Sequence, residues 1–115
     1  MVEFCKNQSI AVVAYCPLGR ATKEILAEPV LNEIATNKNK TVAQVLLRWL
    51  IQRDIVVIPK TSKTNRLSEN INIFDFQLND EEMRRIFSLN KNQRIITQAL
   101  AVNNPNYPFN IPYRR

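Results

Sequence analysis

The residues with the clearest chemical potential directly follow an apolar, β-branched run at 55–59. Lys60, Thr61 and Ser62 place an ammonium and two hydroxyls there, ahead of a predicted helix whose first backbone N–H groups are free. A helix N-terminus at the carboxyl end of a strand is a natural anion site. Solvated surface charge is the alternative role for Lys60 and Arg66. Their position after a buried strand favours contact with a phosphate.

A second candidate is Tyr15, which ends an apolar run at 10–15 and precedes Cys16-Pro17-Leu18-Gly19. An aromatic ring at a strand end serves a core more often than a ligand. Cys5 and Cys16 are too few for a disulfide framework and wrongly spaced for a metal site. We expect both to be inert buried thiols in a reducing compartment.

The composition of the 115 residues excludes several kinds of chemistry. The chain contains no histidine, which removes the commonest acid/base, any Ser/His or Cys/His pair and most zinc sites. Its only glycine, Gly19, argues against a Gly-rich phosphate loop. We expect no metal.

The formal net charge of +6 suits an anionic partner such as a nucleotide, a nucleic acid or an acidic membrane. The basic residues are dispersed, which disfavours nucleic acid. No window approaches 18 apolar residues and no secretory signal pattern opens the chain, so neither a membrane span nor secretion is expected. The predicted location is cytoplasmic.

The elements that must position these residues follow from periodicity. The apolar runs 10–15 and 55–59 predict two strands that are buried on both faces, as in a parallel sheet. Apolar spacing predicts helices near 29–37, 41–53, 64–71 and after Asn79. Three capping predictions accompany them: Thr41 with Gln44, Asn79 with Glu82, and Thr64 or Ser62 at the third helix.

The apolar stripe of the 41–53 helix consists of five residues at helical spacing, Val42, Val45, Leu46, Trp49 and Leu50. We interpret it as core packing and assign it no chemistry. The segment 20–28 is polar and basic, and the chain from Asn90 onward is polar and proline-rich. We expect that last segment to form an irregular tail.

The order strand, helices, strand, helices predicts an α/β fold with two parallel strands. Two strands leave both sheet edges open, which is costly and favours association. The pattern is therefore typical of a slice of a larger α/β barrel, with self-association through the open strand edges as a second expectation.

Several motifs together resemble the C-terminal portion of aldo-keto reductases, closest to the aldose-reductase-like branch. They are Ile-Ala-Val-Val-Ala-Tyr-Cys-Pro-Leu-Gly (10–19), Lys-Thr-Val-Ala-Gln-Val-Leu-Leu-Arg-Trp (40–49), Gln-Arg-Asp-Ile-Val-Val-Ile-Pro-Lys-Thr (52–61), Arg66 with Glu69-Asn70, Ile73-Phe74-Asp75-Phe76, and Asn-Pro-Asn-Tyr-Pro-Phe (104–109). The resemblance runs in order over essentially all of residues 1–115. It implies a (β/α)₈ TIM barrel and NADPH-dependent reduction of aldehydes or ketones to alcohols, with 1–115 as part of that oxidoreductase domain.

The resemblance also implies cofactor roles for eight residues. Tyr15 would stack on the nicotinamide, and Cys16 and Leu18 would line the path of the pyrophosphate. Lys60 would face the 2′-phosphate of NADPH with Thr61 and Arg66. Glu69 and Asn70 would lie at the adenine. The segment between Gly19 and Pro29 is shorter than the family's pyrophosphate loop, for which Arg20 and Lys23 could partly substitute.

The tail at 95–115 resembles the family's C-terminal loop over the substrate. Ile96 and Gln98 are the candidate substrate-facing residues, and a purely structural loop is the alternative. The family's catalytic Asp, Tyr, Lys and His have no counterpart here. We therefore expect the isolated chain to be inactive. A non-catalytic nucleotide-binding or dimerising module is the alternative function.

Overall fold

The computed structural model describes residues 1–93, 95–96, 100 and 102–107. Its two strands, β1 (Val12–Val13) and β2 (Ile55–Val56), pair in parallel with Val12 opposite Ile55 and Val13 opposite Val56. The helical elements are α1 (Val2–Asn7), the 3₁₀ turn η1 (Gly19–Ala21), α2 (Lys23–Leu26), α3 (Pro29–Lys38), α4 (Val42–Ile51), α5 (Thr64–Ile71) and α6 (Asp80–Ser88). The predicted α/β arrangement with two parallel strands is confirmed.

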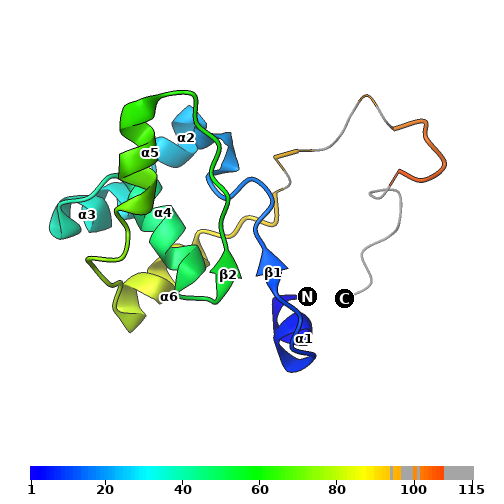
Figure 1. Cartoon of the computed structure of the whole chain (residues 1–115), viewed down its shortest axis with the longest axis horizontal. Helices are drawn as coiled ribbons and strands as arrows, with labels where there is room; N and C mark the ends of the chain where they lie inside the picture. Colours follow the sequence, from blue (N-terminus) through cyan, green and yellow to red (C-terminus); the bar gives the residue numbers. More distant parts are fainter. Residues whose placement is uncertain (94, 97–99, 101, 108–115) are drawn as a thin grey trace.

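In Figure 1, α3 to α6 lie on one side of the strand pair, while α1 lies beneath β1. Helix α4 contacts α3, α5 and β2, and α3 also contacts α6. The main core cluster consists of Leu31, Ile34, Ala35, Val42, Val45, Leu78 and Ile86. No helix in the described part of the chain is long and apolar enough to cross a membrane.

Helix α4 is more widely buried than its apolar stripe predicts. Leu47, which lies outside the stripe, is 0% exposed, and Gln44 and Arg48 are also buried. A helix with neighbours on several sides is buried around most of its circumference. The buried surface of α4 therefore extends beyond the stripe that the sequence predicted as core packing.

The capping predictions have different outcomes. The capping boxes Thr41–Gln44 and Asn79–Glu82 are both present. The predicted side-chain cap of α5 is wrong: its N-cap is Lys63, without a side-chain cap. The side chain that bonds the backbone at this position is that of Thr61, whose Oγ1 accepts a hydrogen bond from the N–H of the N-cap residue Lys63 at 3.1 Å.

The prediction that both strands are buried on both faces is wrong. Ile55 is buried, but Val13 is 53% exposed and Val56, its partner in register, is 48% exposed. Successive side chains of a strand point to opposite faces, and among the described elements the helices cover only one face of the pair. Cys16 is likewise exposed rather than buried, because the chain turns outward there with φ 55°.

Two short helices were not anticipated. Helix α2 lies within the polar 20–28 segment, where the Thr22 side chain accepts from the Ile25 N–H at 3.4 Å. Helix α1 has no buried residue. Neither is long enough to show the apolar periodicity from which a helix is recognised.

Candidate functional site

The segments that follow the two strands lie at the same end of the molecule. Because β1 and β2 are parallel, their carboxyl ends share one edge, where ligand sites of α/β proteins are found. Figure 1 shows the chain leaving both arrowheads at this end, toward α2 from β1 and toward α5 from β2. The structure therefore places the predicted cofactor residues after β1 and after β2 on a common edge.

The segment after β1 is a tight turn with unusual backbone angles. Cys16, Arg20 and Ala21 have positive φ values of 55°, 64° and 49°, as does Gly19 at 53°. Each non-glycine residue held there costs about 1–3 kcal/mol, and such strain gathers at ligand-binding sites. Tyr15 extends from this turn with 75% of its surface exposed. This exposure is unlike that of a core aromatic and leaves its ring accessible to a ligand.

Gly19 has a left-handed backbone, with φ 53°, and little room for a side chain. A Cβ built on Gly19 would collide with the Ile25 side chain and press against that of Ile95. We expect Gly19→Ala to lower the free energy of unfolding by about 1–3 kcal/mol, through the left-handed backbone and the collision. Urea unfolding followed by circular dichroism measures this change.

The matched control is Ala21→Gly in the same turn, where the substitution relieves a left-handed alanine. Its gain should offset the added entropy of the unfolded chain, so its stability should not fall. Equal losses for both variants would contradict the role assigned to this turn.

The segment after β2 is polar and accessible. Lys60 is exposed and Thr61 is half-buried. Arg66 is exposed in the first turn of α5. Neither Lys60 nor Arg66 forms an ion pair with a carboxylate of the described residues. Their charges are thus available to an anion at the N-terminal end of α5.

The remaining two predicted residues of α5 point to different neighbours. Glu69 faces α4, where its Oε1 accepts a hydrogen bond from Thr41 Oγ1 at 2.7 Å. Asn70 lines an apolar groove of about 650 Å³ between β2 and α5. Helix α5 therefore turns Glu69 and Asn70, which are adjacent in sequence, toward two different elements.

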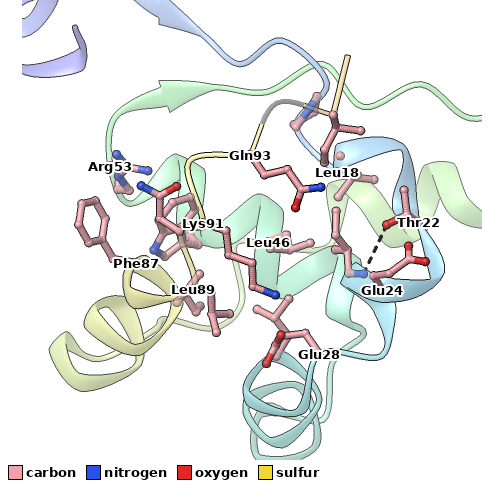
Figure 2. Close-up of a pocket in the computed structure, with 18 residues that line it drawn as sticks. Leu18, Thr22, Glu24, Glu28, Leu46, Arg53, Phe87, Leu89, Lys91 and Gln93 are labelled. Atoms are coloured by element: carbon pink, nitrogen blue, oxygen red, sulfur yellow. Dashed lines mark hydrogen bonds between the residues drawn. The ribbon is translucent and has the colours of Figure 1, made fainter. Parts of the chain in front are cut away.

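A larger cavity of about 810 Å³ lies beside the turn after β1 (Figure 2). Leu18 and Thr22 line one side, and Arg53 and Phe87 line the other. The Arg53 guanidinium lies 4.2 Å from the centroid of Trp49 and 5.7 Å from that of Phe87, within the range of cation–π attraction. Of the eight predicted cofactor residues, only Leu18 reaches this cavity.

The cavity contains residues that sequence reasoning missed. Glu24 and Glu28 line it from α2 and from the residue before α3, and Lys91 and Gln93 enter from the segment after α6. The pKa of Glu24 is lowered, chiefly by a backbone hydrogen bond and then by Thr22. The i, i+4 spacing of Trp49 and Arg53 was a usable signal, but it could not have revealed Phe87.

Two carboxylates outside the cavity contribute to stability in a pH-dependent way. Arg85 donates to both oxygens of Glu33, at 2.8 and 2.6 Å, and lowers the pKa of Glu33. Lys40 donates to Asp75 at 2.7 Å and lowers its pKa. Both contacts lie away from the strand ends and hold helices and loops together.

The sign of the pH effect follows from these lowered pKa values. A carboxyl group whose pKa is lower in the folded state contributes its full stability at pH values above its pKa in the unfolded chain. That unfolded pKa is 4.5 for Glu33 and 3.8 for Asp75. This contribution to stability is lost as the pH falls through the pKa that each group has in the folded state. We expect urea midpoints to fall in this acidic range, and to fall less steeply for the double variant Glu33→Gln, Asp75→Asn. An unchanged slope would show that neither pair is linked to acid unfolding.

The predicted substrate residues lie in the tail. Ile96 is half-buried, and Gln98 lies outside the described residues. Ile95, next to Ile96, lines the 810 Å³ cavity. Ile95 thus lies at the turn after β1, and the substrate role of Ile96 and Gln98 stays a prediction.

The fold and the placement of these residues define an α/β protein with its polar residues at the carboxyl ends of parallel strands. Comparison with known protein families then identifies the family within this class. The model of the aldo/keto reductase family matches residues 1–91, so the chain belongs to the aldo/keto reductase family. The resemblance found in its motifs is confirmed, including the aldose-reductase-like branch.

Individual relatives agree with this assignment. Aldose reductase B of Dictyostelium discoideum is 50% identical over 96 residues, which cover 84% of this chain and 31% of the relative. The aldose reductase structure from Schistosoma japonicum matches with TM-score 0.85 and 40% identity over 97% of this chain and 36% of that one. The Bombyx mori aldo-keto reductase in complex with NADP matches with TM-score 0.79 and 38% identity, covering 93% and 38%. The chain spans 40% of the length of the aldo-keto reductase family 1 member A1 of Gallus gallus and 31% of the length of the Dictyostelium discoideum relative.

Proposed function

We propose that residues 1–115 are the C-terminal, cofactor-binding part of an NADPH-dependent aldo-keto reductase that reduces aldehydes or ketones to alcohols. The observation that carries the proposal is the common edge after β1 and β2, where an exposed tyrosine ring and two cations without carboxylate partners in the described chain are presented together. The Bombyx mori relative, whose structure is in complex with NADP, supports the choice of cofactor.

The donor set fits a nicotinamide dinucleotide phosphate. Tyr15 offers an exposed ring for stacking on the nicotinamide, and Cys16 and Leu18 in the turn after β1 would lie along the pyrophosphate. Lys60 and Arg66, with the Thr61 hydroxyl between them in sequence, suit the 2′-phosphate. When bound, the cofactor supplies the hydride. This chain's residues bind and orient it.

Helix α5 completes the proposed cofactor site. Glu69 and Asn70 follow Arg66 by one turn of α5 and would lie at the adenine. Charge-assisted contacts of Lys60 and Arg66 with a phosphate contribute about 1.5–3 kcal/mol each. NADPH should therefore be preferred over NADH.

The fold proposal is the corresponding portion of a (β/α)₈ barrel. Two parallel strands with α3 to α6 on one side (Figure 1) are too few to enclose a core, and such a strand pair fits within the eight parallel strands of a barrel. Residues 95–115 would form the loop over the substrate.

We further propose that residues 1–115 do not by themselves reduce a carbonyl. The developing alkoxide needs a proton donor, and the sequence contains no histidine and no tyrosine in the family's catalytic context. Mixing the purified chain with NADPH and an aldehyde should give no oxidation of NADPH above the protein-free rate. Oxidation at rates typical of the family would overturn this point.

The experiment that tests the cofactor site directly is a calorimetric titration with adenosine 2′,5′-bisphosphate and, in parallel, adenosine 5′-monophosphate. Saturable binding of the bisphosphate, at least roughly tenfold tighter than the monophosphate, is expected from one added charge-assisted contact. Equal affinities would remove the assignment of the 2′-phosphate to Lys60, Thr61 and Arg66.

A second candidate function is association with another polypeptide. Val13, Val56 and Ile58 are 53%, 48% and 71% exposed, and an exposed apolar strand surface with open edges favours pairing in trans. Light scattering during size-exclusion chromatography should then show a defined oligomer of this chain. A folded monomer at all concentrations would exclude self-association through these strands.

A further inference from the structure

The capping box of α4 also holds the neighbouring helix α5. Thr41 Oγ1 donates to Glu69 Oε1 at 2.7 Å. Gln44, only 6% exposed, donates from Nε2 to the backbone oxygen of Glu69 at 3.1 Å and to that of Asn72 at 3.0 Å. The last carbonyls of a helix need partners from outside it. Here α4 supplies them to α5.

These contacts leave Gln44 no alternative orientation. Its Oε1 accepts from the Thr41 N–H at 2.9 Å, while the Thr41 hydroxyl oxygen accepts from the Gln44 N–H at 3.2 Å. Both ends of the buried amide are thus bonded, and moving it would break hydrogen bonds in two helices at once. A buried polar group left without its partners is costly. The geometry of Glu69 relative to α4 is therefore fixed.

The second capping box of the chain shows that this link is not a general consequence of capping. In α6, Asn79 and Glu82 make the same reciprocal bonds. The outward partner of Glu82 is Lys38, whose Nζ lies 3.0 Å from Glu82 Oε2. That box joins α6 to α3, and among the described residues Asn79 and Glu82 make no side-chain hydrogen bond or ion pair with α5. Only the α4 box reaches a residue of the proposed cofactor site.

The Thr41 hydroxyl leaves one carboxylate oxygen of Glu69 available. Glu69 Oε1 is engaged by Thr41, and Oε2 has no ion-pair or hydrogen-bond partner among the described residues. A carboxylate oxygen accepts hydrogen bonds only. In this position Glu69 Oε2 can accept a hydrogen bond from the exocyclic amino group of adenine. It would repel a base that carries a carbonyl oxygen at the same position.

We propose that Thr41 and Gln44 are positioning residues for the nucleotide base: they fix the Glu69 carboxylate so that it selects an amino-bearing purine. The inference rests on the proposed function, in which α5 carries the residues at the adenine. It adds that base selectivity is set by α4, a helix that itself need not contact the cofactor.

The test compares Kd values for NADPH and for its hypoxanthine analogue, which carries an oxygen in place of the amino group. Quenching of the fluorescence of Trp49, the only tryptophan, reports binding. The wild-type chain should prefer NADPH by roughly tenfold, the effect of one charge-assisted hydrogen bond. Thr41→Asp keeps a side chain that caps α4 but cannot donate a hydrogen bond to Glu69. In this variant the two Kd values should therefore become nearly equal.

Two control variants distinguish the positioning role of Thr41 from an effect on the stability of the fold. Thr41→Ser keeps the cap and the donor and should retain the wild-type preference. Asn79→Ala removes the cap of α6 and should retain it too, although the fold is weakened. A wild-type chain that does not bind NADPH would overturn the proposed function. A chain that binds NADPH but shows no preference, or a Thr41→Asp variant that keeps it, would overturn the positioning role alone.

Discussion

Replacing Lys60 with methionine should weaken NADPH binding by roughly tenfold to a hundredfold and leave NADH binding nearly unchanged. Lys60 is exposed after β2 and has no ion-pair partner among the described residues. In the proposed cofactor site its charge would contact the 2′-phosphate, a group that NADH lacks. Methionine keeps a similar unbranched length and removes the ammonium.

Arg84→Met is the matched control for net charge. Arg84 lies on α6, where it pairs with Glu81 at 2.5 Å, and α6 lies away from the end of the molecule that presents Lys60 (Figure 1). Removing this charge should change both affinities little, because exposed charges beyond about 10 Å are screened at moderate salt. If Lys60→Met weakens NADPH and NADH equally, Lys60 does not contact the 2′-phosphate.

The largest expected loss of stability comes from Leu47→Ala. Leu47 is 0% exposed on a helix that contacts α3, α5 and β2. Truncating a fully buried leucine costs about 2–5 kcal/mol, through lost apolar burial and the cavity left behind. That is a large part of the 5–15 kcal/mol that typically holds a domain folded. Urea unfolding measures the difference.

Leu50→Ala is the control variant that distinguishes the burial seen in the structure from the burial that the apolar stripe predicts. Leu50 belongs to the stripe but is only half-buried, whereas Leu47 is outside the stripe and fully buried. Leu47→Ala should therefore cost more than Leu50→Ala. The reverse order would show that α4 packs by one face, as its periodicity alone suggests.

Local features of the sequence predicted much of this fold. The capping boxes at Thr41 and Asn79, the approximate bounds of α3 and α5, and the start of α6 depend on residues within a few positions of one another. Strand burial did not follow from the runs at 10–15 and 55–59, because burial depends on which elements cover a strand. The exposure of Val13 and Val56 could be known only from the arrangement of the whole chain.

The candidate site was partly accessible to the same reasoning. The residues after the second strand indicated an anion site at Lys60, whereas the cofactor role of Tyr15 came from the resemblance to the family. The contact between Thr41 and Glu69 joins residues 28 positions apart, and the cation–π contact of Arg53 with Phe87 joins the turn after α4 to α6. Neither leaves a periodic signal in the sequence.

The most direct test of the central claim is an NADPH titration of the purified chain, followed by Trp49 fluorescence and far-ultraviolet circular dichroism. Trp49 lines the cavity beside the turn after β1, so changes at that turn should alter its emission. Saturable binding with a cooperative thermal transition is the expected result. A chain that unfolds cooperatively but shows no saturable change with NADPH would contradict the assignment of the cofactor site to residues 1–115.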